Sequence, residues 1–215
     1  MKRSTAQGAA LRWSSGLRNQ LQNARLLAEL CQPDAPRRIG IAGCHAGAGA
    51  STVALNLALL LRERQHSPVW LAEADVRRPV LAGWLGMAGG GFNRLAEGDT
   101  TLADCGEQHA ATGLQLVTAS VAAQPLLLLQ RAAERLLPPD ADRLLVDLPP
   151  VLDAPDATLV APRLDGVLLV LEAEGTRWEV AREARHRLEA AGAHVIGAVL
   201  NKKPHPIPNW LYRLL

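Results

Sequence analysis

Residues 43–52 read Gly43-Cys44-His45-Ala46-Gly47-Ala48-Gly49-Ala50-Ser51-Thr52, a glycine-rich turn. The turn follows the apolar run 39–42, which we expect to be a strand, and it precedes a helix expected from about Ser51 to Arg64. Glycines there let backbone N–H groups curl around an anion, and the helix start adds partial positive charge. The segment predicts a phosphate-binding loop, with an ordinary glycine-rich strand-to-helix turn as the alternative.

Strand and helix patterns alternate along the rest of the chain. Further strands are expected at 68–72, 114–118, 144–147, 166–171 and 194–200, and helices at 79–85, 125–136, 156–161 and 176–191. Residues 166–171 are apolar throughout, which is typical of a strand covered on both faces. The alternation predicts an α/β fold with a doubly wound, mainly parallel sheet and helices on both faces. A phosphate-binding turn after the first strand would make this fold P-loop NTPase-like. Residues 86–99, with three consecutive glycines, are expected to be a loop.

The length of 215 residues fits one such domain with short extensions. Residues 1–36 are expected to be a polar tail and an amphipathic helix, the latter over about 17–30. Residues 37–203 form the predicted P-loop NTPase-like domain, and residues 204–215 form a proline-rich C-terminal tail.

Composition excludes several classes of function. The net charge is +2 with no long basic run, which argues against nucleic-acid binding. Three cysteines without CxxC spacing argue against a disulfide framework or a zinc site, and they fit a reducing cytosol. No apolar run approaches 18 residues, so we expect no membrane span and a cytoplasmic location.

Carboxylates follow two of the predicted strands. Glu73 and Asp75 come just after the strand at 68–72, and Asp147 ends the strand at 144–147. Acids at the carboxyl ends of strands beside a phosphate loop are where magnesium and water are held. Ser51 stands where the hydroxyl of a P-loop binds magnesium. Each acid taken singly could instead be a solvated loop residue.

Together these segments resemble the bacterial tyrosine kinase (BY-kinase) branch of the MinD/ParA P-loop proteins, over about residues 17–201. The family's second Walker motif, Asp-x-Asp-x-Arg-Arg-Pro, is similar to residues 73–79. Its Walker B motif, a hydrophobic run followed by Asp-x-Pro-Pro, matches residues 147–150. Residues 165–170 and 197–201 also look like family segments.

The resemblance implies a site for ATP or ADP with Mg²⁺. Glu73, Asp75 and Asp147 would form the catalytic set, and Asn201 would face the adenine. The phosphates would lie on Gly47, Ala48, Gly49, Ala50, Ser51 and Thr52, and the metal on Ser51, Glu73 and Asp147.

Departures from the family pattern predict weak or lost ATP-dependent activity. Ala50 replaces the lysine that would contact the β- and γ-phosphates, and Glu73 replaces the first aspartate. His45 or Arg77 could supply another cation, although His45 fits an ordinary loop residue better. The chain has one tyrosine, Tyr212, where active members carry a cluster, so we expect no working autophosphorylation tail.

Three functions follow as expectations. The first is a degenerate BY-kinase-like protein that regulates exopolysaccharide or capsule biosynthesis or export. It would dock on a membrane-bound polysaccharide co-polymerase or export protein, peripheral to the inner membrane, with homo-oligomers as a further partner state. The second is an active ATP-dependent protein-tyrosine kinase or ATPase of the same pathway. The third is a MinD-like membrane-surface ATPase, with the apolar residues of 210–215 as its anchor.

Overall fold

The computed structural model describes residues 25–65, 67–98, 100–137 and 143–202. The polar tail, most of the expected N-terminal helix and the proline-rich tail with Tyr212 lie outside these residues. The described part of the N-terminal helix is α3, Arg25–Leu30.

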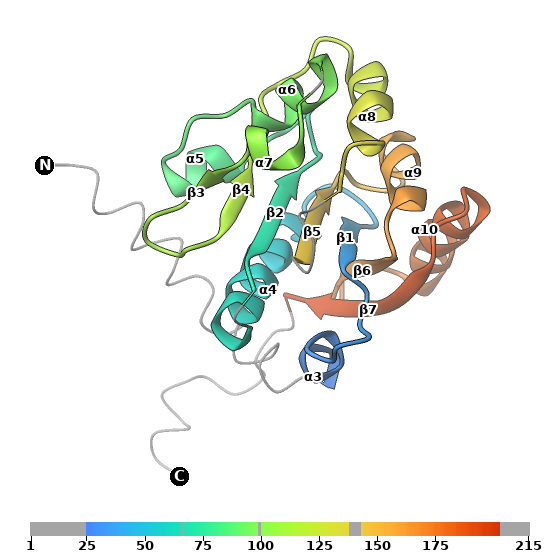
Figure 1. Cartoon of the computed structure of the whole chain (residues 1–215). Coiled ribbons are helices and arrows are strands. Elements are labelled where there is room, and N and C mark those ends of the chain that lie inside the picture. The colour runs from blue at the N-terminus through green and yellow to red at the C-terminus, as the bar shows by residue number, and fades with distance from the viewer. Residues whose placement is uncertain (1–24, 66, 99, 138–142, 203–215) are drawn as a thin grey trace, which may run out of the picture.

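A seven-stranded sheet forms the centre of the molecule, in the order β3-β4-β2-β5-β1-β6-β7 (Figure 1). Every neighbouring pair is parallel except β3 with β4, so the predicted fold class is confirmed. The strands are β1 Arg38–Gly43, β2 Val69–Glu73, β3 Glu107–Gln108, β4 Gln115–Val117, β5 Arg143–Leu148, β6 Gly166–Glu172 and β7 Val195–Asn201.

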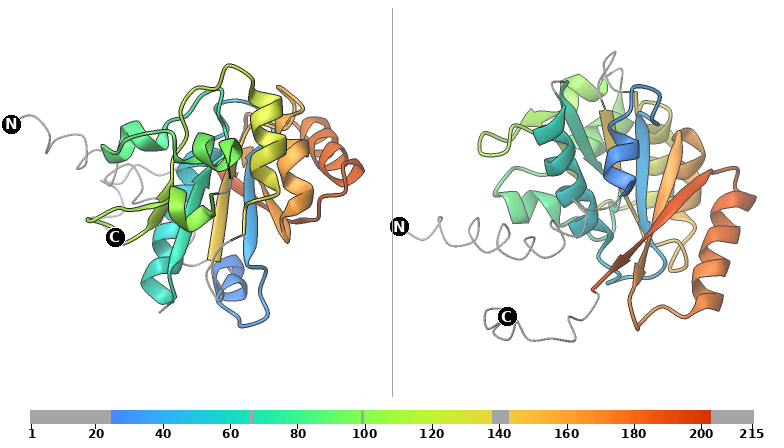
Figure 2. Two further views of the ribbon diagram at one scale, coloured as in Figure 1. Left: turned by 45° about the horizontal axis from the view of Figure 1, so that its top comes forward. Right: turned by 90° about the horizontal axis from the view of Figure 1, so that it is seen from below.

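Helices cover both faces of this sheet (Figure 2). One core lies between the sheet and α3, α4 and α5, and the other lies between the sheet and α6 to α10. The remaining helices are α4 Ala50–Arg64, α5 Leu81–Leu85, α6 Gly91–Glu97, α7 Leu102–Cys105, α8 Pro125–Ala133, α9 Asp156–Val160, the 3-10 turn η1 Ala161–Arg163, and α10 Trp178–Ala190.

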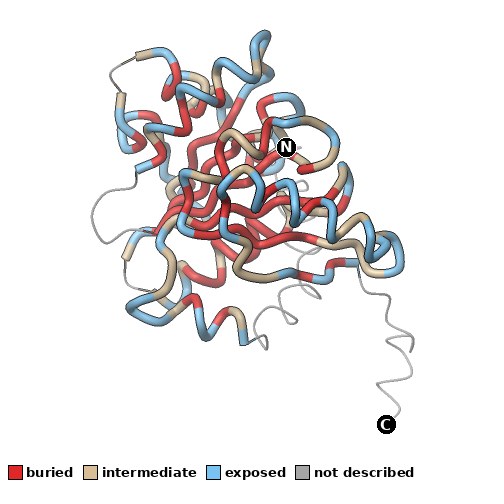
Figure 3. The backbone as a smooth tube through the Cα atoms, turned by 90° about the vertical axis from the view of Figure 1, so that its right-hand side faces the viewer, coloured by how far each residue is buried: buried red, intermediate tan, exposed pale blue. Residues whose placement is uncertain are grey.

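The central strands are apolar throughout because they contribute to both cores. In β5, Leu145 packs in the core under α4, while its neighbours Leu144 and Val146 pack in the opposite core. Successive side chains of a strand point to opposite faces, so a sheet covered on both sides needs apolar residues at each position. The buried residues accordingly concentrate along the strands (Figure 3).

The expectation of a loop over residues 86–99 is wrong, because the segment contains α6. Phe92, Leu95 and Ala96 of this helix are buried at helical spacing. The preceding glycines mark close packing: a Cβ on Gly91 would lie 2.5 Å from the carbonyl oxygen of Cys105. Gly90 caps the helix with φ 107°.

A buried arginine secures the amino end of β5. Arg143 is 7% exposed, and its guanidinium donates hydrogen bonds to the carbonyl oxygens of Gln32 and Pro36 and to the side chain of Gln65. Burial lowers the pKa of Arg143 from its ordinary value. The residue thereby ties the connection between α3 and β1 to the sheet.

Within the described ranges, none of the helices combines the length and the apolar character that crossing a bilayer requires.

The packing of Gly91 generates a first prediction. Gly91→Ala should lower the free energy of unfolding by about 1–3 kcal/mol, the usual cost of forcing an extra group into a packed site. Gly83 lies inside α5, and a Cβ there would meet no atom within 4 Å. Gly83→Ala should therefore raise stability slightly, because alanine favours helix. Urea unfolding of both variants checks the pair, and a neutral Gly91→Ala would contradict the proposed close contact.

Candidate functional site

The loop between β1 and α4 has the backbone of an anion-binding turn. Gly47 and Gly49 adopt φ of 83° and 93°, a region that glycine enters without strain. Gly49 is the N-cap residue of α4, and it has no side chain that could cap the first N–H groups of the helix. The first N–H groups of α4 have no acceptor within the helix, and they point with its partial positive charge toward the loop. Residues 43–52 therefore form the predicted glycine-rich strand-to-helix turn, and phosphate binding by this turn stays a prediction.

Asn201, at the end of β7, braces this loop. Its side-chain nitrogen donates to the carbonyl oxygen of Ala48 at 2.9 Å, and Asn201 is 8% exposed. A Cβ on Gly49 would lie 2.1 Å from that nitrogen, so the contact requires glycine. Asn201 does not line the cavity described next, and its expected contact with adenine stays a prediction.

A cavity of about 270 Å³ opens over the phosphate loop. It is formed by the loop itself and by the segments that follow β2 and β5. Its lining includes His45, Gly47, Ala48, Gly49, Ala50, Ser51, Thr52, Asp75, Arg78, Trp84 and Pro150. The predicted loop residues and Asp75 are thus brought together, while Glu73, Asp147 and Asn201 lie outside the lining.

Asp147 is a buried carboxylate whose oxygens have no hydrogen-bond donor of good geometry in the described part of the chain. It is 1% exposed, and burial raises its pKa well above the ordinary value, while interaction with the Ser51 hydroxyl opposes that rise. The charges of Glu73 and Asp75 raise it further. A buried acceptor left without donors, beside a hydroxyl of the loop, fits a divalent cation or its bound water.

Glu73 lies opposite Asp147 in the register of β2 and β5, but its surroundings differ. Its carboxylate accepts the backbone N–H groups of Val80, Leu81 and Ala119. Burial raises the pKa of Glu73, and the three N–H bonds act against that rise. Glu73 therefore fastens the segments after β2 and β4, where the sequence led us to expect a magnesium ligand.

The described residues contain no group of three or more histidine, cysteine, aspartate or glutamate side chains arranged to hold a metal ion. A cation at this site would depend on Asp147, Ser51 and oxygens that a ligand brings.

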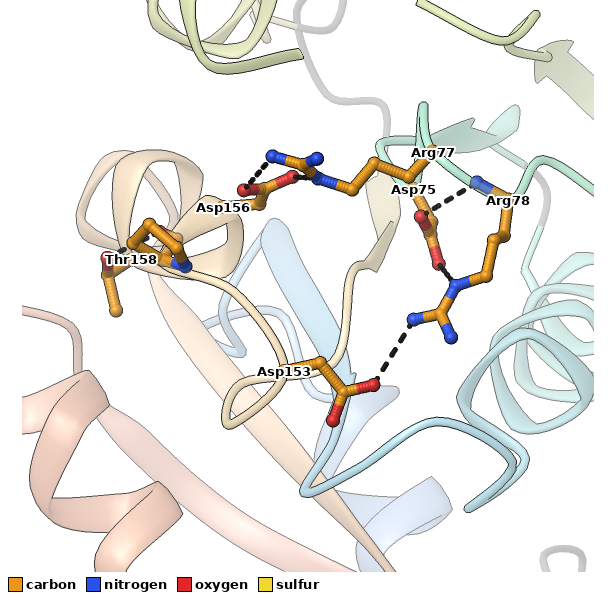
Figure 4. Close-up of polar contacts among 7 residues, drawn as sticks. Asp75, Arg77, Arg78, Asp153, Asp156 and Thr158 are labelled. Atoms are coloured by element: carbon orange, nitrogen blue, oxygen red, sulfur yellow. Dashed lines mark hydrogen bonds and ion pairs between the residues drawn. The ribbon is translucent and has the colours of Figure 1, made fainter.

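Two consecutive arginines after β2 serve different purposes (Figure 4). Arg77 forms a two-pronged ion pair with Asp156, the buried first residue of α9, and this pairing raises the pKa of Arg77. Arg78 lines the cavity and contacts Asp75 and Asp153. Sequence reasoning named Arg77 as a replacement for the loop lysine and missed Arg78, since the run 73–79 does not reveal which way each side chain turns.

His45 also lines the cavity, but both of its ring nitrogens contact other residues of the chain. One ring nitrogen lies 2.9 Å from the carbonyl oxygen of Ala46, and the other lies 3.3 Å from the hydroxyl of Thr176. Asp153, which the sequence did not single out, accepts the backbone N–H of Ala46 at 3.1 Å. An acid six residues beyond Asp147 carries no recognisable signal, because it sits in an irregular turn.

Curated relatives of the chain are bacterial tyrosine kinases. Tyrosine-protein kinase CpsD of Streptococcus agalactiae is 28% identical over 171 residues, covering 76% of this chain and 74% of that protein. Tyrosine-protein kinase YwqD of Bacillus subtilis is 28% identical over 167 residues, covering 73% and 68%. No family model matches the chain.

Solved structures agree with these relatives. The kinase domain of VpsO superposes with a TM-score of 0.69 at 27% identity, covering 92% of this chain and 96% of that domain. The cell division ATPase MinD of Pyrococcus furiosus gives a TM-score of 0.64 at 22% identity, covering 81% and 76%, which shows the shared fold. The chain is therefore a homologue of the bacterial tyrosine kinases and has the fold that they share with MinD-type P-loop ATPases.

Proposed function

We propose that the chain is a BY-kinase-like P-loop protein that regulates capsule or exopolysaccharide biosynthesis or export, with weak or lost ATP-dependent activity. The observation that carries the proposal is Ala50 at the first position of α4, in the lining of the cavity. A methyl group stands there in place of the ammonium group that neutralises nucleotide phosphates in P-loop proteins.

Charge neutralisation decides how much function survives, because phosphoryl transfer depends almost wholly on positioning and electrostatics. Losing a cation from a buried phosphate site costs about 3–5 kcal/mol, by analogy with a broken buried ion pair. That corresponds to roughly two to four decades in affinity or rate. Arg78 cannot simply take the lysine's place, since its guanidinium already faces Asp75 and Asp153.

The remaining parts of the site still suit phosphate and magnesium. The glycine loop supplies backbone donors, and Ser51 with the unpartnered carboxylate of Asp147 would hold Mg²⁺. When bound, the ion would neutralise charge on the phosphate oxygens. Asp75, whose side chain is 15% exposed, is the carboxylate of the lining and the residue we assign to an attacking group.

The partner we propose is a membrane-bound polysaccharide co-polymerase or export protein, which the chain would bind in the manner of the kinases it resembles. An active protein-tyrosine kinase is the second candidate, supported by the 28% identity with CpsD. The two differ in one measurable property, the affinity of the unmodified chain for magnesium nucleotide.

Calorimetric titration with Mg-ATP and Mg-ADP tests the proposal. The unmodified chain should bind at millimolar strength or not at all, and Ala50→Lys should tighten binding by about two decades or more, since it restores the missing cation. Ala190→Lys, at the exposed end of α10, adds the same charge away from the site and should change nothing. Micromolar binding by the unmodified chain would contradict the proposal and favour the active kinase.

Asp147→Asn tests the buried carboxylate. The folded chain holds the Asp147 proton more tightly than the unfolded chain, because the pKa is raised in the fold. As pH rises above the ordinary value of 3.8, the unfolded chain releases that proton first and stability falls. The variant has no such proton, so its free energy of unfolding should exceed that of the parent by about 1–3 kcal/mol at neutral pH, the usual cost of an unsatisfied buried group.

Urea unfolding across the acidic to neutral range measures this difference, which should vanish as pH falls toward the ordinary pKa of aspartate. Glu73 is present in both proteins, so its own raised pKa cancels in the comparison. Added magnesium should reduce the difference in free energy of unfolding between the variant and the parent at neutral pH. The carboxylate of the parent attracts the cation, whereas the amide of the variant does not. A variant that is less stable than the parent at neutral pH would contradict this assignment.

A further inference from the structure

A carboxylate of the chain itself pairs with two residues that line the cavity, Ala46 and Arg78. Asp153 Oδ2 accepts the backbone N–H of Ala46 at 3.1 Å. The same oxygen lies 3.3 Å from Nη2 of Arg78 (Figure 4). Backbone N–H groups of a glycine loop and guanidinium groups are the donors that bind phosphate oxygens in proteins. One oxygen of Asp153 therefore stands where an oxygen of a bound phosphate would find its donors.

Arg78 is held from a second side by Asp75. Its backbone N–H donates to Asp75 Oδ1 at 3.1 Å, and its guanidinium lies 3.8 Å from Oδ2 of the same residue. Among the described residues, Arg78 supplies the guanidinium that lines the cavity, and the carboxylates of Asp75 and Asp153 face it. Its positive charge is thus neutralised within the molecule before any ligand arrives.

Backbone pairing brings Asp153 to this place. The N–H groups of Val151 and Leu152 donate to the carbonyl oxygens of Gly43 and Cys44, at the end of β1. These two bonds lay the turn after β5 against the start of the phosphate loop, so the next residue reaches the loop's donors. The side chain of Asp153 is 35% exposed, which leaves it room to turn away.

We propose that Asp153 is an internal anion that competes with phosphate groups for the phosphate loop and for Arg78. A ligand of the pyrophosphate or nucleoside diphosphate class binds by displacing this carboxylate and pairing with the freed guanidinium. Asp153 thereby sets the selectivity of the cavity against weakly charged anions. The ligand class rests on the proposed function, whereas the competition itself rests on the contacts of Asp153.

The absent lysine and the present carboxylate weaken phosphate binding separately. Ala50 leaves the cavity without the cation of a P-loop lysine, and Asp153 occupies donors of two lining residues, Ala46 and Arg78. Because a phosphate would contact both positions, their effects are expected to be coupled rather than strictly additive.

Titration of the whole chain with pyrophosphate tests the competition. Asp153→Asn keeps the shape of the side chain and removes its charge, and it should strengthen binding about tenfold, because a like charge is taken from within contact distance of the ligand. The gain should shrink as salt is added. Asp34→Asn makes the same chemical change at an exposed position and should leave binding unaltered. Adding Arg78→Gln to Asp153→Asn should reduce the gain, because the freed guanidinium is then missing.

The same comparison in the Ala50→Lys background, with Mg-ADP as the ligand, covers the case in which the parent binds pyrophosphate too weakly to measure. Thermal unfolding of each variant confirms that it is folded. Equal affinities with and without Asp153→Asn in both backgrounds would overturn the inference and leave the proposed function standing. Tight Mg-ATP binding by the unmodified chain would overturn the proposed function, while the effect of Asp153→Asn would still decide the inference.

Discussion

The parallel pairing of β1 between β5 and β6 is the constraint on which the site depends. This pairing sets Ile41 opposite Asp147 on one side and opposite Leu168 on the other. All carboxyl ends of the central strands therefore meet at one edge, and the chain must turn there. The elements of the candidate site lie at or just beyond that edge: the phosphate loop, Arg77, Arg78, Asp147 and the side-chain amide of Asn201.

Two carboxylates at this edge differ in the hydrogen-bond donors around them, although they lie on adjacent strands of the same sheet. Glu73 and Asp147 lie opposite each other on adjacent strands, and both are buried. Glu73 is satisfied by three backbone donors and stabilises the turns around it. Asp147 finds no such donors among the residues that the structure describes, and its burial costs the fold stability. Proteins keep such unsatisfied groups mainly where a ligand completes them, so the contrast supports the proposal that Asp147 binds a ligand and that Glu73 has a structural role.

The sequence was sufficient for most of the fold and for part of the site. Strand, turn and helix at the phosphate loop were predictable, because apolar runs and glycines act locally. The position of Asp147 near the carboxyl end of β5 was predictable, because it follows an apolar run. Arg78 and Asp153 were not, since their positions depend on turns whose direction is set by distant backbone bonds such as Leu152 to Cys44. Helix α6 was not predicted, because the glycines at its start indicated a loop. In the structure these glycines allow close packing, which composition alone does not reveal.

The buried guanidinium of Arg143 bears on where the folded unit begins. Two of its three acceptors are the carbonyl oxygens of Gln32 and Pro36, upstream of β1, and Leu27 and Leu30 of α3 are buried in the core beneath α4. A shortened chain starting at β1 would leave a buried cation with one acceptor and open an apolar surface under α4. The connection between α3 and β1 is therefore part of the packed domain, and a swap or fusion of this module should keep α3 attached.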